Sequence, residues 1–338
     1  MKKLKVLKVF WMTKMFSKVW FWLENSRLFT IPMSVFSWLV VFTFAFFHGG
    51  NVLNGILALI GICCGQLATN LFDDYVDYKV LTKKGTLHKQ TKSKCRYILE
   101  GKATLDEVFN VVCIYCAISV IIGFYLFLNT GFPVIIYAIL GGIFVLTYAK
   151  WSSSGLGELA VGIVFGPILF GGVYWVMTQS FSQDVFLLSI IHVMFTIGLL
   201  YTNALLDFDG DKASHKPTLC QRFGNKENAL AGFGIIYGIG YGLLIYNVFS
   251  GFFSAFYIIA LLTAPLTVEL INSMSLFNKD KNSIPHKRFW DTPFEKWDEI
   301  KNTEIAGFRF RMYQARNLQM YFSIFLSIAI ILQYKLWY

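Results

Sequence analysis

Two groups of acidic and amide side chains stand directly after long apolar runs of the chain. The first acidic cluster consists of Asn70, Asp73, Asp74 and Asp77, and the second acidic cluster consists of Asn203, Asp207 and Asp211. If the apolar runs are helices that continue into the clusters, the acidic and amide side chains of each cluster lie one or two turns apart on one face of the helix. Like charges one turn apart destabilise a helix unless something neutralises them. Hard oxygen ligands at this spacing suit Mg²⁺, which proteins bind through carboxylates together with substrate phosphates.

The alternative is that these carboxylates are ordinary helix-end charges in a solvated interface. Two clusters of matching design in the two halves of the chain favour a metal site, because two facing sites would clamp a diphosphate. We therefore expect two Mg²⁺ ions, bound with the diphosphate. The expected metal ligands are Asp73, Asp74, Asp77, Asp207 and Asp211, assisted by Asn70 and Asn203.

Basic residues follow each acidic cluster, and most of them are interpreted as charges of one membrane face with no role in a site. A leaving diphosphate nevertheless needs cations beyond the metals. Arg96, after the first cluster, and Lys212, after the second, are candidates for that catalytic role. Lys216 is a candidate for substrate binding.

Aromatic and ionisable side chains within the apolar regions are further candidates for contact with a substrate. Tyr75 and Tyr148 could stabilise an allylic cation by cation–π attraction, although aromatic residues also gather at membrane interfaces without such a role. Glu158 lies inside an apolar run, where a charge is costly, so it could orient an acceptor or take a proton. Its alternative is an interface carboxylate. His192, in the middle of a run, is expected to form a hydrogen bond between helices rather than to act as a catalyst.

The elements that must position these residues are membrane-spanning helices. Of the 338 residues 56% are hydrophobic and only 15% are charged, against roughly 25% charged in soluble domains. The apolar residues come in runs of about 20, the length that crosses a hydrocarbon core. These figures exclude a soluble enzyme, a disordered chain and a disulfide-stapled secreted fold. We expect an all-α bundle of nine transmembrane helices at residues 28–47, 52–72, 108–128, 132–148, 156–177, 185–206, 229–249, 252–274 and 320–336.

The basic residues are distributed unequally between the two ends of these runs. With nine crossings, 29 of the 30 Lys and Arg fall on one side, and the exception is Lys335. The positive-inside rule then puts the N-terminus and the candidate site in the cytoplasm and the C-terminus outside. A cell membrane is the simplest setting. The net charge of +10 therefore indicates phosphate and a membrane surface as partners, rather than nucleic acid.

Two segments flank or interrupt the predicted bundle. Residues 1–27 carry seven basic residues among apolar ones and are predicted to be an interfacial helix on anionic lipid. Residues 28–338 are predicted to form a single transmembrane domain. Within it, residues 276–318 form a cytoplasmic loop that is rich in aromatic residues for a linker, so we expect it to pack on the membrane surface or to cover the site.

The sequence NLFDDYVD at residues 70–77 resembles the N-x-x-N/D-D-x-x-D motif of the UbiA superfamily of intramembrane prenyltransferases. Asp73 stands where that family more often has Asn. Asp207 and Asp211, followed by Lys212, are similar to the second motif of the family, D-x-x-x-D. KPTL at residues 216–219 with RFG at 222–224 resembles the stretch that follows this motif. Residues 96–101 are similar to the segment R-x-x-x-x-G. The likeness extends over nearly the whole chain and implies a nine-helix bundle.

Within this superfamily, SRLFTIP at residues 26–32 and GLGE at residues 155–158 resemble the 1,4-dihydroxy-2-naphthoate branch, which serves menaquinone synthesis. KWSSS at residues 150–154 departs from the Pro- and Tyr-rich segment that is usual there. The resemblance implies Mg²⁺-dependent transfer of a polyprenyl group from polyprenyl diphosphate to an aromatic acceptor. If the acceptor is dihydroxynaphthoate, it also implies loss of the acceptor's carboxylate.

Several other functions remain open at this point. Other UbiA-type acceptors are 4-hydroxybenzoate, haem, chlorophyllide, homogentisate and the glycerol ethers of lipid synthesis, and the clamp residues would be common to all of them. A transporter with a carboxylate cation site is an alternative of another class. Its carboxylates usually lie near the midplane on interrupted helices, whereas here they follow the apolar runs.

Overall fold

The computed structural model describes residues 17–83, 95–213 and 217–336, and this part of the chain is helical without any β-strand. Eight of its helical segments are long and apolar enough to cross a membrane, and a ninth apolar helix, Pro133–Tyr148, is shorter. They follow the nine predicted runs in order. The all-helical polytopic class is therefore confirmed, while the exact number of crossings and their orientation stay predictions.

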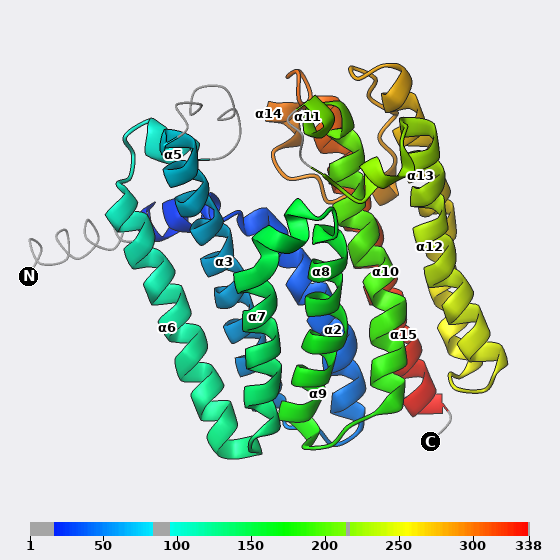
Figure 1. Ribbon diagram of the computed structural model, residues 1–338. Helices are drawn as coiled ribbons and strands as arrows, with labels where there is room; N and C mark the ends of the chain where they lie inside the picture. The colour runs from blue at the N-terminus through cyan, green and yellow to red at the C-terminus, as the bar shows by residue number, and fades with distance from the viewer. Residues whose placement is uncertain (1–16, 84–94, 214–216, 337–338) are drawn as a thin grey trace, which may run out of the picture. The chain divides into compact units, whose positions relative to one another are not determined.

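The long helices (Figure 1) are α2 (Ile31–Phe47), α3 (Val52–Lys83), α6 (Leu105–Thr130), α7 (Pro133–Ser153), α10 (Gln183–Leu206), α12 (Lys226–Phe249), α13 (Ala264–Lys279) and α15 (Ala306–Leu336). The chain divides into two compact units. The first unit takes in residues 1–34 and 56–128, and the second takes in residues 35–55 and 129–338.

The first unit is built around α3 and α6. Ser119 Oγ on α6 donates a hydrogen bond to the Gly61 carbonyl of α3 at 2.8 Å, which ties the two helices within the apolar region. Residues 17–25 are helical, and Trp22 is buried against Leu71 and the short helix α5 (Arg96–Leu99). The part of the basic N-terminal segment at residues 1–16 lies outside the described residues.

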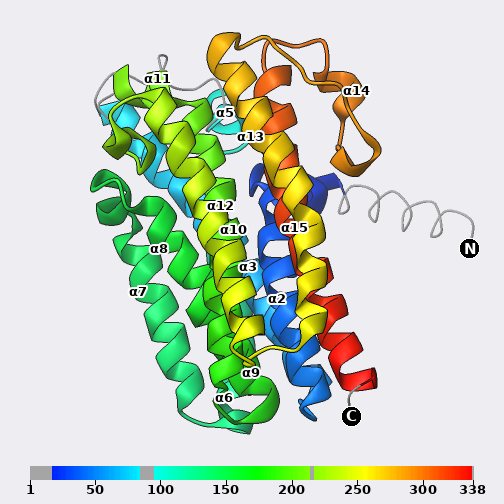
Figure 2. The ribbon, with the colours of Figure 1, turned by 90° about the vertical axis from the view of Figure 1, so that its right-hand side faces the viewer.

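The second unit is centred on α10, which is the most deeply buried of the candidate spans. Helices α12 and α15 pack along it, as Figure 2 shows. His192 Nε2 on α10 lies 2.9 Å from Ser323 Oγ on α15, which is the hydrogen bond between helices that we expected of this histidine. One turn away, Gln319 Nε2 donates to Thr196 Oγ1 at 2.9 Å. Bonds of this kind satisfy polar groups that lipid would otherwise leave unpaired.

The fifth predicted span is a helix with a break. It consists of α8 (Gly157–Ile163), the π-helical turn η2 (Val164–Ile168) and α9 (Leu169–Thr178). Pro167 lies inside η2 and Gly166 has non-helical angles, because proline lacks the N–H of the helical ladder and clashes with the preceding turn. A Cβ on Gly166 would lie 3.0 Å from Val193 of α10, so the break lets the two backbones approach closely.

The connection between the last two spans is shorter than the predicted loop at residues 276–318. Helix α13 continues to Lys279 and α15 begins at Ala306, so the connection is residues 280–305, which we call the cap segment. The predicted span at 320–336 does not include the first turns of α15, because these turns contain arginines and are not part of an apolar run. Arg311 is fully buried, but it donates to the carbonyls of Ser273, Ser283 and Gly307, so the helix can accommodate its charge.

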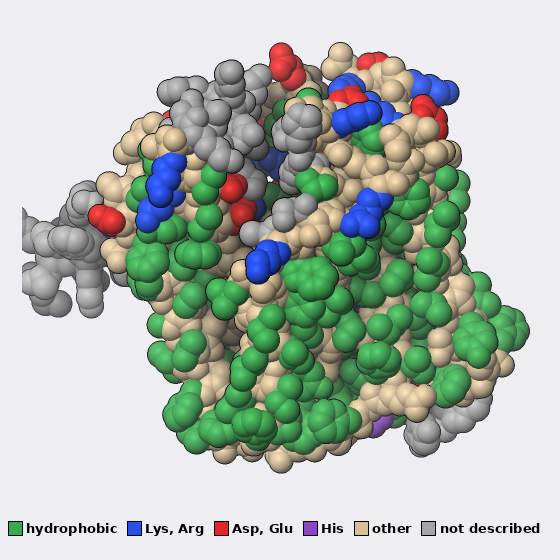
Figure 3. Space-filling model, viewed as in Figure 1, with side chains coloured by type: hydrophobic (Ala, Val, Ile, Leu, Met, Phe, Trp, Pro, Cys, Tyr) green, Lys and Arg blue, Asp and Glu red, His purple; other side chains and the backbone are tan. Residues whose placement is uncertain are grey.

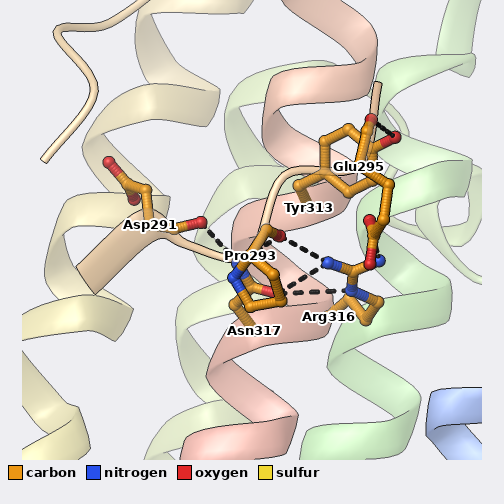
Figure 4. A network of polar contacts seen from close by, with 6 residues as sticks. All are labelled: Asp291, Pro293, Glu295, Tyr313, Arg316 and Asn317. Carbon is orange, nitrogen blue, oxygen red and sulfur yellow. Dashed lines mark hydrogen bonds and ion pairs between the residues drawn. The ribbon is translucent and has the colours of Figure 1, made fainter. Parts of the chain in front are cut away.

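The cap segment is bonded to α15 by a polar network. Arg316 on α15 donates to Glu295 Oε2 and to the Pro293 carbonyl, each at 2.6 Å, as Figure 4 shows. Asn317 donates to the Asp291 carbonyl. That this segment packs on the membrane surface or covers the site stays a prediction.

Figure 3 shows one face of the molecule, on which mostly hydrophobic side chains cover the middle of the helices. In each unit, the charged side chains on this face lie near one end. Long exposed apolar side chains such as Leu146, Ile121 and Phe249 are expected where lipid rather than water is the solvent. Within each unit, the charged end is also the end that carries its acidic cluster.

Candidate active site

Helix α3 carries the first acidic cluster without a break. It extends from Val52 to Lys83, so Asn70, Asp74 and Asp77 lie one and two turns apart along it, as predicted. Asp74 is the most buried member at 3% exposure, and Asp73 and Asp77 are half-buried. A buried carboxylate needs a charge partner or a metal, so the surroundings of Asp74 decide what this cluster can bind.

Arg27 supplies a positive charge to this cluster. Its Nη2 lies 3.2 Å from Asp73 Oδ2 and also contacts Asp74 Oδ1. Burial opposes the charge of the guanidinium, but the two carboxylates outweigh it and raise the pKa of Arg27. Sequence spacing alone does not predict this role of Arg27, because nothing local connects the residue to carboxylates 46 and 47 positions away.

A hydrogen-bond network fixes the backbone that carries Arg27. Thr30 Oγ1 donates to the Arg27 carbonyl at 2.9 Å and accepts from Gln66 Nε2 and from Asn70 Nδ2, each at 3.1 Å. Asn70 Nδ2 also donates to the Ser26 carbonyl at 2.9 Å. Both N–H groups of the Asn70 side-chain amide therefore donate hydrogen bonds, and the amide oxygen of this side chain is the atom that can bind a metal ion.

The short segment that begins at Cys95 packs against the same cluster. Cys95 Sγ donates to the Asp74 carbonyl at 3.2 Å. The hydroxyl of Tyr97 is buried without a hydrogen-bond partner, and burial, with a contribution from the charge of Asp74, raises the pKa of that hydroxyl. Tyr97 is thus a neutral donor close to the carboxylates, which the sequence did not single out.

The second acidic cluster lies where α10 ends. Asp207 is the residue that ends α10, and the short helix α11 (Phe208–Ala213) follows at once. The bend does not interrupt the hydrogen bonds, since Asp207 N donates to the Asn203 carbonyl at 3.1 Å and Asp211 N to the Asp207 carbonyl at 2.9 Å. Asn203 and Asp207 are exposed, whereas Asp211 is buried at 5% exposure. The predicted spacing therefore holds, with one buried and two exposed members.

A third carboxylate of this region, Asp209, is neutralised by two lysines. Lys226 Nζ lies 2.6 Å and Lys281 Nζ 2.9 Å from Asp209 Oδ2. Their hydrogen bonds lower the pKa of Asp209. Lys226 at the start of α12 and Lys281 of the cap segment therefore both pair with Asp209.

The GLGE string forms a turn that packs on the segment after the second cluster. Gly155 has a left-handed φ of +69°, and a Cβ there would lie 3.4 Å from the Thr218 carbonyl. Arg222 Nη2 donates to the Ser154 carbonyl at 2.5 Å. A Cβ on Gly157 would lie 3.6 Å from the hydroxyl of Tyr148 on α7, so the side chain of this predicted aromatic residue lies near the turn.

Glu158 lies in the first turn of α8 and is buried at 9% exposure. Burial raises the pKa of the Cys220 thiol, and the charges of Glu158 and Asp211 add to that rise. Cys220 is therefore close to both carboxylates. The structure thus gathers Tyr148, Glu158 and Asp211 around one end of the second unit.

For the other predicted site residues among the described part of the chain, no contact with an acidic cluster is recorded. Arg96 is exposed and pairs with Glu100 at 2.6 Å. The ring of Tyr75 lies 5.5 Å from that of Phe109 on α6, and Lys79 Nζ lies 4.2 Å above it. Lys212 is exposed. Lys216 lies outside the described residues. The roles of these residues stay predictions.

The donor set fits Mg²⁺, which prefers carboxylate and amide oxygens. The structure supports that fit in the first unit, where two of the carboxylates already bind a cation, the Arg27 guanidinium. As they stand, no three acidic, His or Cys side chains among the described residues converge on one metal position, which agrees with Asp73 and Asp74 being directed toward Arg27.

Comparison with known proteins assigns this chain to a family. A model of the UbiA prenyltransferase family matches residues 27–292. The 1,4-dihydroxy-2-naphthoate octaprenyltransferase of Haemophilus influenzae is 27% identical over 220 residues, which cover 61% of this chain and 70% of that protein. The digeranylgeranylglyceryl phosphate synthase of Methanosphaera stadtmanae is 27% identical over 236 residues, which cover 68% of this chain and 80% of that protein.

A solved structure has a similar fold. It is a UbiA homologue from Archaeoglobus fulgidus bound to GPP and Mg²⁺, with a TM-score of 0.53 and 13% identity, and the match covers 92% of this chain and 99% of that one. The family match spans most of the chain and includes both acidic clusters. The predictions of the family and of an enzyme rather than a transporter are therefore confirmed, and this chain is a prenyltransferase that belongs to the UbiA prenyltransferase family.

Proposed function

We propose that this enzyme transfers a polyprenyl group from polyprenyl diphosphate to 1,4-dihydroxy-2-naphthoate in a membrane, and that the transfer requires Mg²⁺. The observation that carries the proposal is the pair of acidic clusters at the charged ends of α3 and α10, each with a buried carboxylate, Asp74 or Asp211. Both clusters would act in the same reaction. The solved homologue that binds GPP and Mg²⁺ supports this chemistry.

The carboxylates and amides of the clusters would hold the metal and thereby the diphosphate. When bound, Mg²⁺ neutralises the diphosphate and makes it a better leaving group. The residues of the chain that would bind it are Asn70, Asp73, Asp74, Asp77, Asn203, Asp207 and Asp211. Arg96 and Lys212 would add positive charge near the leaving group.

The remaining predicted residues would serve the acceptor and the prenyl cation. The allylic C–O bond of the donor breaks and the diphosphate leaves with the electron pair, while an electron-rich ring carbon of the acceptor forms the new C–C bond. The acceptor then loses its carboxyl group as CO₂. Glu158, buried beside the GLGE turn, would orient the acceptor or take a proton. Tyr75 and Tyr148 would stabilise the cation, and Lys216 would bind substrate.

The choice of acceptor rests on the two sequence strings and on the relatives. Thr30 of the string at 26–32 bonds Asn70 of the first cluster, and the GLGE turn packs on the segment after the second cluster. Each string therefore lies near one acidic cluster, which supports its part in the proposed function. A second candidate is a glycerol-ether lipid acceptor, because the relative from Methanosphaera stadtmanae is as similar as the one from Haemophilus influenzae.

The test is an assay of purified enzyme in lipid nanodiscs with a polyprenyl diphosphate and each acceptor in turn. We expect diphosphate release and prenylated product with dihydroxynaphthoate, only when Mg²⁺ is present. Asp74→Asn and Asp207→Asn should abolish both, while Asp298→Asn, at an exposed position of the cap segment, should leave them unchanged. Activity that survives in the first two variants would contradict the metal assignment, and product with the glycerol ether alone would contradict the acceptor.

A further inference from the structure

Two carboxylates of the first acidic cluster are already paired with a basic side chain of their own unit. One guanidinium nitrogen of Arg27 contacts both Asp73 and Asp74, which are the carboxylates that the proposed function assigns to a metal. A carboxylate as buried as Asp74 would be strongly destabilised without a positive partner. The pairing therefore stabilises the cluster when no metal is bound.

The position of Arg27 is built into the fold and is not the chance contact of a surface side chain. Its backbone has a left-handed φ of 60°, a conformation that costs a non-glycine residue about 1 kcal/mol or more. The bonds of Thr30 to the Arg27 carbonyl and of Asn70 to the Ser26 carbonyl hold the backbone there. The side chain of Arg27 itself is a quarter exposed, so the guanidinium can leave the carboxylates without unfolding the segment.

A metal ion and a guanidinium cannot occupy the same carboxylate oxygens. Mg²⁺ requires oxygen ligands at close and well-ordered distances, and its charge would repel a guanidinium held between Asp73 and Asp74. We propose that Arg27 is an internal counter-ion of the first acidic cluster, which Mg²⁺ must displace in order to bind, so that competition with Arg27 sets the metal affinity of this cluster. The inference rests on the proposed function and adds its regulation.

Metal binding without any prenyl donor tests this competition. Mn²⁺ serves as the probe, and its binding is measured by electron paramagnetic resonance on the nanodisc protein in an Asp207→Asn background, which weakens binding at the second cluster. Arg27→Gln should bind Mn²⁺ roughly tenfold more tightly or better, because a hydrogen bond between charged groups no longer competes. Lys301→Gln removes one positive charge from an exposed pair in the cap segment and should leave the affinity unchanged.

A second measurement uses the arginine of the unaltered protein, in case Arg27→Gln does not fold. Phenylglyoxal modifies free guanidinium groups, and the modified peptides are quantified by mass spectrometry. Addition of Mg²⁺ should increase modification of Arg27 several-fold. Arg311, which is fully buried among backbone carbonyls, is the matched control and should not change.

The outcomes separate this inference from the proposed function. Equal or weaker Mn²⁺ binding in Arg27→Gln overturns the competition, and so does modification of Arg27 that Mg²⁺ leaves unchanged or decreases. If the Asp207→Asn protein binds Mn²⁺ and Asp74→Asn loses activity, the proposed function stands while only the role of Arg27 fails. Absence of Mn²⁺ binding even in Arg27→Gln overturns the competition alone, because the proposed function has the metal bound together with the diphosphate.

Discussion

Lys281 Nζ lies 2.9 Å from Asp209 Oδ2, so the first residues of the cap segment are attached to the region of the second acidic cluster. Asp209 is half exposed, and exposed ion pairs stabilise a protein by about 1 kcal/mol or less. We expect Lys281→Gln to lower the free energy of unfolding by that modest amount. Lys226, at 2.6 Å from the same oxygen, should retain part of the neutralisation.

The pH dependence of this pair has a definite sign. The two lysines lower the pKa of Asp209 in the folded protein, so their stabilisation is present above the ordinary Asp value of about 3.9 and is lost as the pH falls through the lowered value. The difference in melting temperature between the parent protein and Lys281→Gln should therefore be constant from pH 5 to 7 and vanish in strong acid. A difference that grows on acidification would contradict the assignment.

Local sequence patterns predicted the features of the structure that depend only on residues close together along the chain. The apolar runs predicted the helices because hydrophobic length is a local signal, and the spacing of Asp74 and Asp77 predicted a shared face because α3 continues through them. The partners of the carboxylates were not predictable in this way. Arg27 reaches Asp74 across 47 positions, and such a contact depends on how distant helices pack.

The start of α15 shows a second limit. An apolar window ends at charged residues, but Arg311 is buried and its charge is satisfied by carbonyl groups of α13 and the cap segment. The cost of burying an arginine depends on those partners. A sequence pattern does not contain them, and the predicted loop at 276–318 therefore extended too far.

The GLGE turn offers a test of the second unit with a matched control. Gly155 and Gly131 both have a left-handed φ, at +69° and +83°, so alanine at either position should cost about 1 kcal/mol. Only Gly155 packs on Thr218 and the Arg222 side chain. We expect equal losses of thermal stability, with a large loss of transferase activity in Gly155→Ala alone. Equal activity in the two variants would remove the turn from the site.

The polar network of the cap segment predicts how firmly it is held. Arg316→Gln removes the bonds to Glu295 and to the Pro293 carbonyl, and a hydrogen bond to a charged group stabilises by about 1.5–3 kcal/mol. Amide hydrogen exchange in residues 289–297 should therefore accelerate tenfold or more, while exchange in α10 stays unchanged. Lys301→Gln should have no effect on either. Acceleration throughout the protein would mean that Arg316 stabilises the fold as a whole.

Burial of Cys220 predicts an unreactive thiol beside the second cluster. The residue is fully buried, its thiol donates to the Tyr201 carbonyl at 3.6 Å, and its pKa is raised. The thiolate is the reactive form, and its fraction stays very small at any pH well below the raised pKa. In a variant that keeps Cys220 as its only cysteine, maleimide labelling should therefore stay slow from pH 7 to 9 and become fast on unfolding.

An introduced cysteine in the cap segment, Asn302→Cys, provides the exposed reference for this measurement, because residue 302 is solvent-exposed. Its labelling should rise about tenfold per pH unit below an ordinary thiol pKa of about 8.5. Folded Cys220 should be slower by several orders of magnitude, because both the protonated state and the burial oppose reaction. Rates within tenfold of each other at pH 8 would show that the segment between α11 and α12 opens readily, and the packing of the GLGE turn on Thr218 would then be transient.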